Sequence, residues 1–189
     1  MITKPFSPRD IFAQPVVNSS RVFLSPQRYI QGPGVIKNCG LYLSLINAKH
    51  VGVLASKRGF SAEAANVLQS LNEAGIEYSK AEFRGECSKE EVERHTNDLM
   101  SAKPDCILAV GGGKLVDAGK CIAYRLNCQV GIIPTLASND APCSSISVLY
   151  TVDGVKDVVE YFPQNPAFVI VDTEVIVNAS ERYLVAGIG

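Results

Sequence analysis

Along most of this chain, short apolar runs alternate with stretches of helical periodicity. Runs of about four to eight apolar residues that are bounded by polar ones are typical of buried strands. We therefore predict strands at HVGVLA (50–55), DCILAV (105–110), QVGIIP (129–134) and AFVIVD (167–172). The mixed stretch IEYSKAEF (76–83) is a further strand candidate.

Segments with apolar residues at helical spacing lie between these strands. The first extends over residues 59–74, and Gly75 provides a C-terminal stop. The second opens at Ser88, which forms a capping box with Glu91 and predicts a helix to about residue 102. A third helix follows a triple glycine. The apolar positions of the first and third helices are Phe60, Ala64, Val67, Leu68 and Leu71, then Leu115, Ala118, Gly119, Ile122 and Leu126.

The segment after the strand 129–134 has a different character. ISVLYTV (146–152) and KDVVEYF (156–162) flank Asp153 and Gly154, a pair that is typical of a tight β-hairpin turn. This pattern predicts a hairpin inserted after the strand, and a last helix is expected to begin near Ala179.

Repeated strand–helix units predict an α/β fold, a doubly wound, mostly parallel Rossmann-like sheet with the inserted β-hairpin. We assign residues 22–189 to one dinucleotide-binding α/β domain and residues 1–21 to a flexible N-terminal extension. A chain of 189 residues has room for little more than one such domain.

Composition narrows the function classes. The net charge of −1 gives no basic excess for binding nucleic acid or an anionic membrane surface. No apolar stretch reaches the roughly 20 residues of a membrane helix, because Arg125 interrupts the best candidate. We expect a cytoplasmic protein. Ser and Arg residues near the N-terminus leave mitochondrial targeting as an alternative, against which Asp10 and two early prolines count.

The cysteines and histidines do not suggest a metal centre. The six cysteines have no C-x-x-C spacing, and we expect them to be reduced. Cys106 lies in an apolar run and Cys121 in a helical pattern, where small buried apolar residues are usual. The two histidines, His50 and His95, lie on unrelated segments, and we assign both to structural or solvated positions. A zinc site built wholly within this chain is therefore not expected, and the metal ligand set of the chain is predicted to be empty.

The stretch GGGKLVDAGK (111–120) is the strongest chemical signal. A glycine turn between a strand and a helix forms an anion site, because the first helical amides and the positive end of the helix dipole face the turn. Glycine also permits positive φ and close approach of a ligand. The turn fits neither common fingerprint: Val116 replaces the third Rossmann glycine, and Leu115 follows the lysine where the Walker motif has Ser or Thr. It indicates phosphate or pyrophosphate binding without ATPase chemistry.

Lys114 and Asp117 share one face of the helix that follows. They are either a surface ion pair worth a few tenths of a kcal/mol or ligand-binding residues, and their closeness to the glycines favours the second reading. Gly119 costs about 1 kcal/mol relative to Ala inside a helix, so we expect it to permit close packing of the helix on a strand.

A polar loop, PTLASNDAPCSSISVLY (134–150), follows the carboxyl end of a predicted strand, where open α/β sheets bind ligands. Its hydroxyls and carboxylate could equally well satisfy local backbone amides in Asx- and ST-turns. The loop offers Thr135, Ser138, Asp140, Ser144 and Ser145.

Taken together, these segments resemble the glycerol dehydrogenase family, within the iron-containing alcohol dehydrogenase and dehydroquinate synthase superfamily. The resemblance starts at SPQRYIQGPGVI (25–36) and includes GECSKEEVER (85–94) and the glycine motif. It continues through PTLASNDAPCSSISVLYTVDG (134–154), NPAFVIVDT (165–173) and LVAGIG (184–189). All of these segments correspond to the N-terminal nucleotide-binding domain of the family.

The resemblance implies hydride transfer from an alcohol carbon of glycerol or a small polyol to NAD, assisted by zinc or another divalent metal. It implies that the pyrophosphate is bound by the glycine turn, and that Asp140 is the catalytic carboxylate that engages the polyol. It also implies a homo-oligomer. The implied cofactor-binding residues are Gly112, Gly113 and Lys114 at the pyrophosphate, Thr135 and Ser138 on the adenosine side, and Asp117, Ser144, the backbone of Ile146, and Tyr150 around the nicotinamide half.

The sequence departs from the family pattern at several positions. The family usually has an acidic residue just after the first buried strand, but here Ser56 is followed by Lys57 and Arg58, which leaves NADP open beside NAD. Asn139 stands where the family has Thr, a mild change. The sequence ends at Gly189, one residue before the aspartate that is the family's first metal ligand. We therefore expect cofactor residues here, with the helical C-terminal domain absent.

These observations lead to one main hypothesis and its alternatives. The chain is predicted to be the cofactor-binding half of an NAD-dependent glycerol dehydrogenase, inactive alone. Either it is a fragment, or a complementary C-terminal domain chain is its partner. The alternatives are an sn-glycerol-1-phosphate dehydrogenase-like enzyme and a non-catalytic nucleotide-binding module.

Overall fold

A computed structural model describes residues 6–12 and 22–188 of the chain. Within these residues a six-stranded sheet has the strand order β1-β8-β5-β4-β2-β3, and every pairing in it is parallel. The predicted mostly parallel α/β fold is therefore confirmed. The strands of this sheet are β1 (Tyr29–Gly32), β2 (His50–Ser56), β3 (Glu77–Phe83), β4 (Cys106–Gly111), β5 (Gln129–Pro134) and β8 (Phe168–Asp172).

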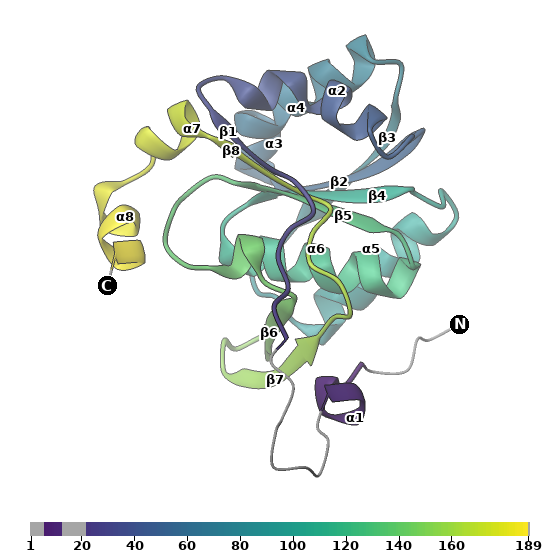
Figure 1. Ribbon diagram of the computed structural model, residues 1–189, viewed down its shortest axis with the longest axis vertical. Coiled ribbons are helices and arrows are strands. Elements are labelled where there is room, and N and C mark those ends of the chain that lie inside the picture. Colours follow the sequence, from purple (N-terminus) through teal and green to yellow (C-terminus); the bar gives the residue numbers. More distant parts are fainter. Residues whose placement is uncertain (1–5, 13–21, 189) are drawn as a thin grey trace.

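Helices cover both faces of the sheet (Figure 1). Helices α2, α3 and α4 lie on one face, and α5 and α6 lie on the other. The helices and 3-10 turns of the described residues are α1 (Pro8–Phe12), η1 (Val35–Asn38), α2 (Cys39–Ser44), α3 (Lys57–Phe60), α4 (Glu63–Glu73), α5 (Lys89–Met100), α6 (Gly113–Leu126), η2 (Ala141–Cys143), α7 (Thr173–Val177) and α8 (Glu181–Ile188).

The central strands supply side chains to both layers of the core, because neighbouring residues of a strand point to opposite faces. On β4, Leu108 and Val110 pack with α2 and α4, whereas Ile107 and Ala109 pack with α5 and α6. Each of these side chains is at most 1% exposed. This two-sided burial explains why the strand reads as a continuous apolar run.

The inserted hairpin is confirmed. Strands β6 (Ile146–Tyr150) and β7 (Lys156–Tyr161) form a separate antiparallel sheet, with Val148 opposite Val159. Gly154 has φ of 83° in the turn between them. The hairpin lies below α6 in Figure 1, at a distance from the main sheet.

Several local predictions need correction. The apolar pattern over 59–74 predicted one helix, but Ser61 and Ala62 divide it into α3 and α4. Ala62 has φ of −126° and ψ of −109°, which is far from helical. Strand β1, helix α2 and helix α7 were missed, and the last helix begins at Glu181, two residues later than expected.

The predicted capping box is half formed. The Ser88 hydroxyl accepts a hydrogen bond from the Glu91 backbone N–H at 3.2 Å, as expected. The Glu91 carboxylate does not close the box; its Oε1 accepts from the backbone N–H of Arg84 at 2.7 Å. The acid at this position therefore ties α5 to the end of β3.

The predicted burial of Cys106 and Cys121 is confirmed. All six cysteines are free, and Cys39, Cys87, Cys106 and Cys121 are buried. Burial raises the pKa of Cys39 to about 12, and it also raises the pKa of Cys128 to about 12. Thiols of this kind are inert at neutral pH.

Most of the proposed N-terminal extension lies outside the described residues. Within the described part, Phe6 forms an isolated antiparallel bridge with Tyr161 of β7, and α1 follows it. None of the helices in the described ranges has the length and apolar character of a membrane-spanning segment.

Candidate functional site

The strand order reverses direction between β2 and β4. The chain passes from β2 outward to β3, and then returns to the other side of β2 to form β4. In open α/β sheets such a switch leaves a crevice at the carboxyl ends of the two strands, and ligands bind there. The end of β4 is Gly111, so the glycine turn lies at this crevice.

The glycine turn connects β4 directly to α6. Gly111 is the last strand residue, Gly112 is the N-cap of α6, and Gly113 is its first helical residue. The N-cap has no side chain to bond the first amides of the helix. Because those amides carry the positive end of the helix dipole, the turn presents an anion-binding surface.

The expected reason for the glycines was partly wrong. Gly112 has φ of −84°, and the triple glycine is absent from the described residues with positive φ. The space beside two of these glycines is already narrow. A Cβ at Gly113 would lie 2.8 Å from Asn139 Nδ2, and one at Gly111 would lie 2.8 Å from Leu115 Cδ1. A side chain would therefore fill the space beside the turn.

A hollow of about 550 Å³ opens beside the turn. It brings together Gly112, Gly113, Lys114, Thr135 and Ser138, all predicted from the sequence to bind the cofactor. Segments from the ends of β2, β4 and β5 form its walls, as expected for the carboxyl edge of the sheet. Its further lining residues include Ser56, Arg58, Glu63, Leu136, Asn139 and Tyr183.

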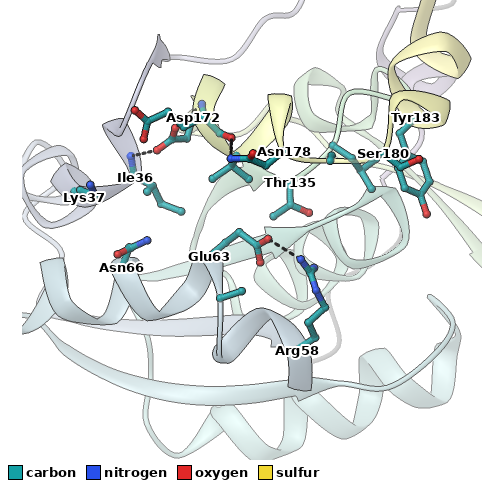
Figure 2. Close-up of a pocket in the computed structure, with 15 residues that line it drawn as sticks. Ile36, Lys37, Arg58, Glu63, Asn66, Thr135, Asp172, Asn178, Ser180 and Tyr183 are labelled. Atoms are coloured by element: carbon teal, nitrogen blue, oxygen red, sulfur yellow. Dashed lines mark hydrogen bonds and ion pairs between the residues drawn. The ribbon is translucent and has the colours of Figure 1, made fainter.

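A second hollow of about 650 Å³ lies next to the first, and the two share the lining residues Arg58, Glu63, Thr135, Leu136 and Tyr183. Figure 2 shows that helices α7 and α8 form one side of it and α4 the other. Arg58 Nη2 lies 3.3 Å from Glu63 Oε1, and this ion pair stands where the two hollows meet. The two hollows form one continuous region along the carboxyl edge of the sheet.

Lys114 is held by a neighbouring acid. Its Nζ forms an ion pair with the carboxylate of Glu86, which precedes α5, and its side chain is 58% exposed. The predicted partner on the same helix face, Asp117, pairs with Lys120 instead. The i,i+3 surface pair of Lys114 and Asp117 is therefore replaced by two separate ion pairs.

Asp117 faces the hairpin. Its Oδ2 accepts from the Val148 backbone N–H at 3.0 Å, and its backbone carbonyl accepts from the Ser147 hydroxyl at 2.9 Å. Its Oδ1 lies 2.8 Å from Lys120 Nζ but has no partner with hydrogen-bond geometry. The carboxylate thus anchors β6 on α6, and one buried oxygen retains acceptor capacity.

The remaining predicted residues do not line the glycine hollow. Asp140 is exposed and its carbonyl accepts from the Cys143 N–H at 2.9 Å. Ser144 Oγ lies 3.3 Å from Lys120 Nζ, and the Tyr150 N–H donates to the Cys87 carbonyl at 2.8 Å. Ile146 is 38% exposed at the start of β6. These residues lie on the loop and hairpin side, with Asp117 and Lys120.

Sequence reasoning missed residues that line the hollows, and it also missed the role of Lys120 beside them. Glu63 and Tyr183 come from helices far apart in the chain, and no local motif marks them. Lys120 was detectable, since it ends the G-G-G-K-x-x-D-x-x-K pattern, but no role was assigned to it. Its side chain is 2% exposed, and its Nζ contacts the carbonyls of Ala141 and Ile146.

The expected positions of the histidines are confirmed. His50 opens β2, and its Nε2 lies 3.0 Å from the Ser79 hydroxyl. His95 lies inside α5, fully buried beside Glu91 and Arg94. Among the described residues, no group of three or more His, Cys, Asp or Glu side chains could hold a metal ion.

Comparisons with known proteins agree with this geometry. The model of the iron-containing alcohol dehydrogenase family matches residues 26–173. The chain is 40% identical over 169 residues to a glycerol dehydrogenase of Escherichia coli O6:H1, covering 89% of this chain and 46% of that protein. It is 39% identical over 164 residues to a glycerol dehydrogenase of Thermotoga maritima, covering 87% of this chain and 44% of that protein.

Solved structures give the same relationship. The crystal structure of glycerol dehydrogenase from Schizosaccharomyces pombe superposes with a TM-score of 0.83 at 37% identity. The match covers 90% of this chain and 43% of that one. The chain therefore spans a little less than half the length of the relatives it matches.

Proposed function

Since the chain belongs to the iron-containing alcohol dehydrogenase family, we propose that it is the cofactor-binding part of an NAD-dependent glycerol (polyol) dehydrogenase. The reaction is transfer of a hydride from a secondary alcohol carbon to NAD. The similarity to glycerol dehydrogenases at 38–40% identity supports glycerol or a small polyol as the substrate.

One observation carries the proposal: an uncapped helix N-terminus in a glycine turn, at the point where the strand order reverses. The hollow beside it, of about 550 Å³, falls within the range of ligand pockets. The N-cap Gly112 leaves the first amides of α6 without a side-chain cap, and such amides suit a pyrophosphate. These residues fit a dinucleotide.

The residues of the chain would share the binding of the dinucleotide along this edge. The backbone of the glycine turn and Lys114 would bind the pyrophosphate, and the shared hollows near Thr135 would take the adenosine. The dinucleotide, when bound, would supply the hydride acceptor. The proposed set is Gly112, Gly113, Lys114, Thr135 and Ser138, with Asp117, Ser144, the backbone of Ile146, and Tyr150 toward the nicotinamide half.

Asp140 is proposed to engage the polyol. Its carboxylate is exposed on the loop between β5 and η2, and hydroxyl groups of a polyol are good donors to such an acceptor. Lys120 Nζ donates a hydrogen bond to the carbonyl of Ala141, the residue after Asp140, and so stabilises the loop backbone at this point.

The family implies a divalent metal, but the described residues do not fit one by themselves. Metal sites with three protein ligands and an open position are typical of catalytic zinc. We propose that a complementary helical domain supplies those ligands, and that it docks against the exposed apolar residues of α8.

Two measurements on the purified 189-residue chain test the proposal. Titration with NAD should show saturable binding, and glycerol with zinc should give no NADH. Adding a complementary helical domain should restore glycerol-dependent NADH formation. Turnover by the chain alone, or absence of any dinucleotide binding, would contradict the proposal.

A second candidate function is a non-catalytic nucleotide-binding module. Such a module would use only the glycine turn and the hollow beside it. It predicts NAD binding but no NADH formation with any complementary domain, so the same reconstitution experiment separates the two.

A further inference from the structure

The carboxyl end of β2 has no carboxylate to offer a ribose. In dinucleotide-binding folds an acidic side chain commonly accepts hydrogen bonds from the ribose hydroxyls, and its absence weakens the preference for NAD over NADP. Here β2 ends at Ser56, followed by Lys57 and Arg58. The Ser56 hydroxyl already accepts from the Gly59 backbone N–H at 3.0 Å, where it caps α3.

A carboxylate reaches the same place from another element. Glu63 is the first residue of α4, and its side chain is 15% exposed. Among the described residues that line the glycine hollow, Glu63 is the sole carboxylate. Figure 2 shows its carboxyl group directed into the space between Arg58 and Thr135, where the two hollows join.

The other acids of the second hollow are not available in this way. Asp172 is 1% exposed, and it accepts from the backbone N–H groups of Gly34, Ile36 and Glu174 at 3.0–3.2 Å. The Asp172 carboxylate is therefore already occupied by the backbone N–H groups at the starts of η1 and α7. Glu174 is exposed and lines the second hollow without reaching the first.

The partner of Glu63 leaves room for a ligand. Arg58 Nη2 contacts Glu63 Oε1 at 3.3 Å, a long contact, and the Arg58 side chain is 79% exposed. An exposed arginine in such a contact is weakly held. Since each carboxylate oxygen accepts more than one hydrogen bond, Glu63 can accept from a diol while Arg58 remains beside it.

We propose that Glu63 determines the cofactor specificity of this chain, by accepting hydrogen bonds from the adenosine ribose hydroxyls of NAD and repelling the 2′-phosphate of NADP. The proposal rests on the proposed function, because it assumes that a dinucleotide lies across the two hollows. The Glu63 carboxylate lies beside Arg58 and offsets part of its positive charge, so Arg58 attracts the 2′-phosphate less strongly. The acid thus takes the place of the missing strand-end carboxylate.

The test is parallel calorimetric titration of NAD and NADP into the 189-residue chain and its Glu63→Gln variant. Loss of a charge-assisted hydrogen bond should weaken NAD binding about tenfold or more, and removal of the negative charge should strengthen NADP binding. The ratio of the affinity for NAD to the affinity for NADP should therefore fall at least tenfold. Glu73→Gln, the same change at the far end of α4, should leave the ratio unchanged.

A second variant, Arg58→Gln, tests the same proposal if Glu63→Gln does not fold. Arg58→Gln removes the nearby cation and leaves the acid, so the preference for NAD over NADP should rise. A lower preference for NAD in Arg58→Gln would overturn the proposal. It would also be overturned if the ratio of NAD affinity to NADP affinity in Glu63→Gln were within twofold of that of the unchanged chain.

The outcomes also separate the inference from the function on which it depends. If the unchanged chain binds neither NAD nor NADP, the proposed function fails and the role of Glu63 fails with it. If the chain binds NAD and Glu63→Gln does not alter the ratio, only the role of Glu63 is overturned.

Discussion

Lys120 and Asp117 form an ion pair that is buried between α6 and the inserted hairpin. Lys120 Nζ lies 2.8 Å from Asp117 Oδ1, and the two side chains are 2% and 12% exposed. The same ammonium donates to the Ala141 carbonyl at 3.0 Å and lies 3.3 Å from Ser144 Oγ. The last lysine of the glycine motif thus supports the polar loop that we propose to face the nicotinamide half.

Replacing Lys120 with Met should lower the free energy of unfolding by about 3–5 kcal/mol, because removal of one partner leaves the buried Asp117 carboxylate uncompensated. Urea denaturation measures the change. Lys156→Met, at an exposed position of β7, is the matched control and should change stability by less than about 0.5 kcal/mol. Equal stability of Lys120→Met and the unchanged chain would show that the pair contributes nothing.

Gly119→Ala should destabilise the chain by about 1–3 kcal/mol, although Ala favours helix by about 1 kcal/mol. The reason is steric: a Cβ at Gly119 would lie 2.5 Å from the Ala109 Cβ of β4. This contact confirms that the glycine permits close helix–strand packing. Asn72→Ala, at an exposed position of α4, is the control and should be neutral or stabilising. A Gly119→Ala variant that gains stability in urea would contradict the packing argument.

Stability should fall as the pH drops below about 6.5, and His95 should account for part of the loss. Burial, and then the positive charge of Arg94, lower the pKa of His95 below its ordinary value of 6.5; Glu91 and Asp98 oppose this change. Below pH 6.5, His95 therefore binds a proton in the unfolded chain more readily than in the folded chain. The stabilisation is complete above pH 6.5 and is lost as the pH falls toward the folded pKa.

Urea midpoints at pH 7.5, 6.5 and 5.5 measure this effect. His95→Gln should flatten the decline between pH 6.5 and 5.5. Glu91 does not interfere in this window: burial would raise its pKa, but hydrogen bonds from Arg94 and the Arg84 N–H lower it below its ordinary value of 4.5. Its contribution is lost only in more acidic solution. An unchanged slope in His95→Gln would contradict the prediction.

The exposed apolar face of α8 should promote self-association. Leu184, Val185 and Ile188 are 51%, 67% and 79% exposed, and contiguous apolar patches commonly mark interfaces. Multi-angle light scattering should show a mass that rises with concentration, and Val185→Glu should lower it. Val152→Glu, at a position 68% exposed in the hairpin turn, is the control. A clean monomer at all concentrations would contradict the prediction.

The fold was largely predictable because its strands are buried on both faces. β4 and β5 read as apolar runs, and the Asp153–Gly154 pair located the hairpin turn. Strand β1 was missed because it is short and lies at the edge of the sheet, where its residues are only partly buried. The break between α3 and α4 leaves the apolar periodicity intact, so the pattern could not locate it.

The candidate site was predictable only where its residues are close in sequence. The glycine turn, Thr135 and Ser138 were identified and share one hollow. Glu63 and Tyr183 reach that hollow through the packing of distant helices, which no local motif encodes. Asp117 was expected beside the ligand. The sequence could not indicate that its carboxylate would accept a hydrogen bond from the Val148 N–H and form an ion pair with Lys120.

The central claim is that the glycine turn and Lys114 bind the pyrophosphate of a dinucleotide. Calorimetric titration of NAD into the unchanged chain and into Lys114→Ala tests it most directly, with Lys49→Ala, just before β2, as the control. We predict saturable binding that Lys114→Ala weakens by about 1–3 kcal/mol, the size of a lost hydrogen bond from a charged group. An affinity that is the same in Lys114→Ala would contradict the claim and leave Lys114 as the surface partner of Glu86.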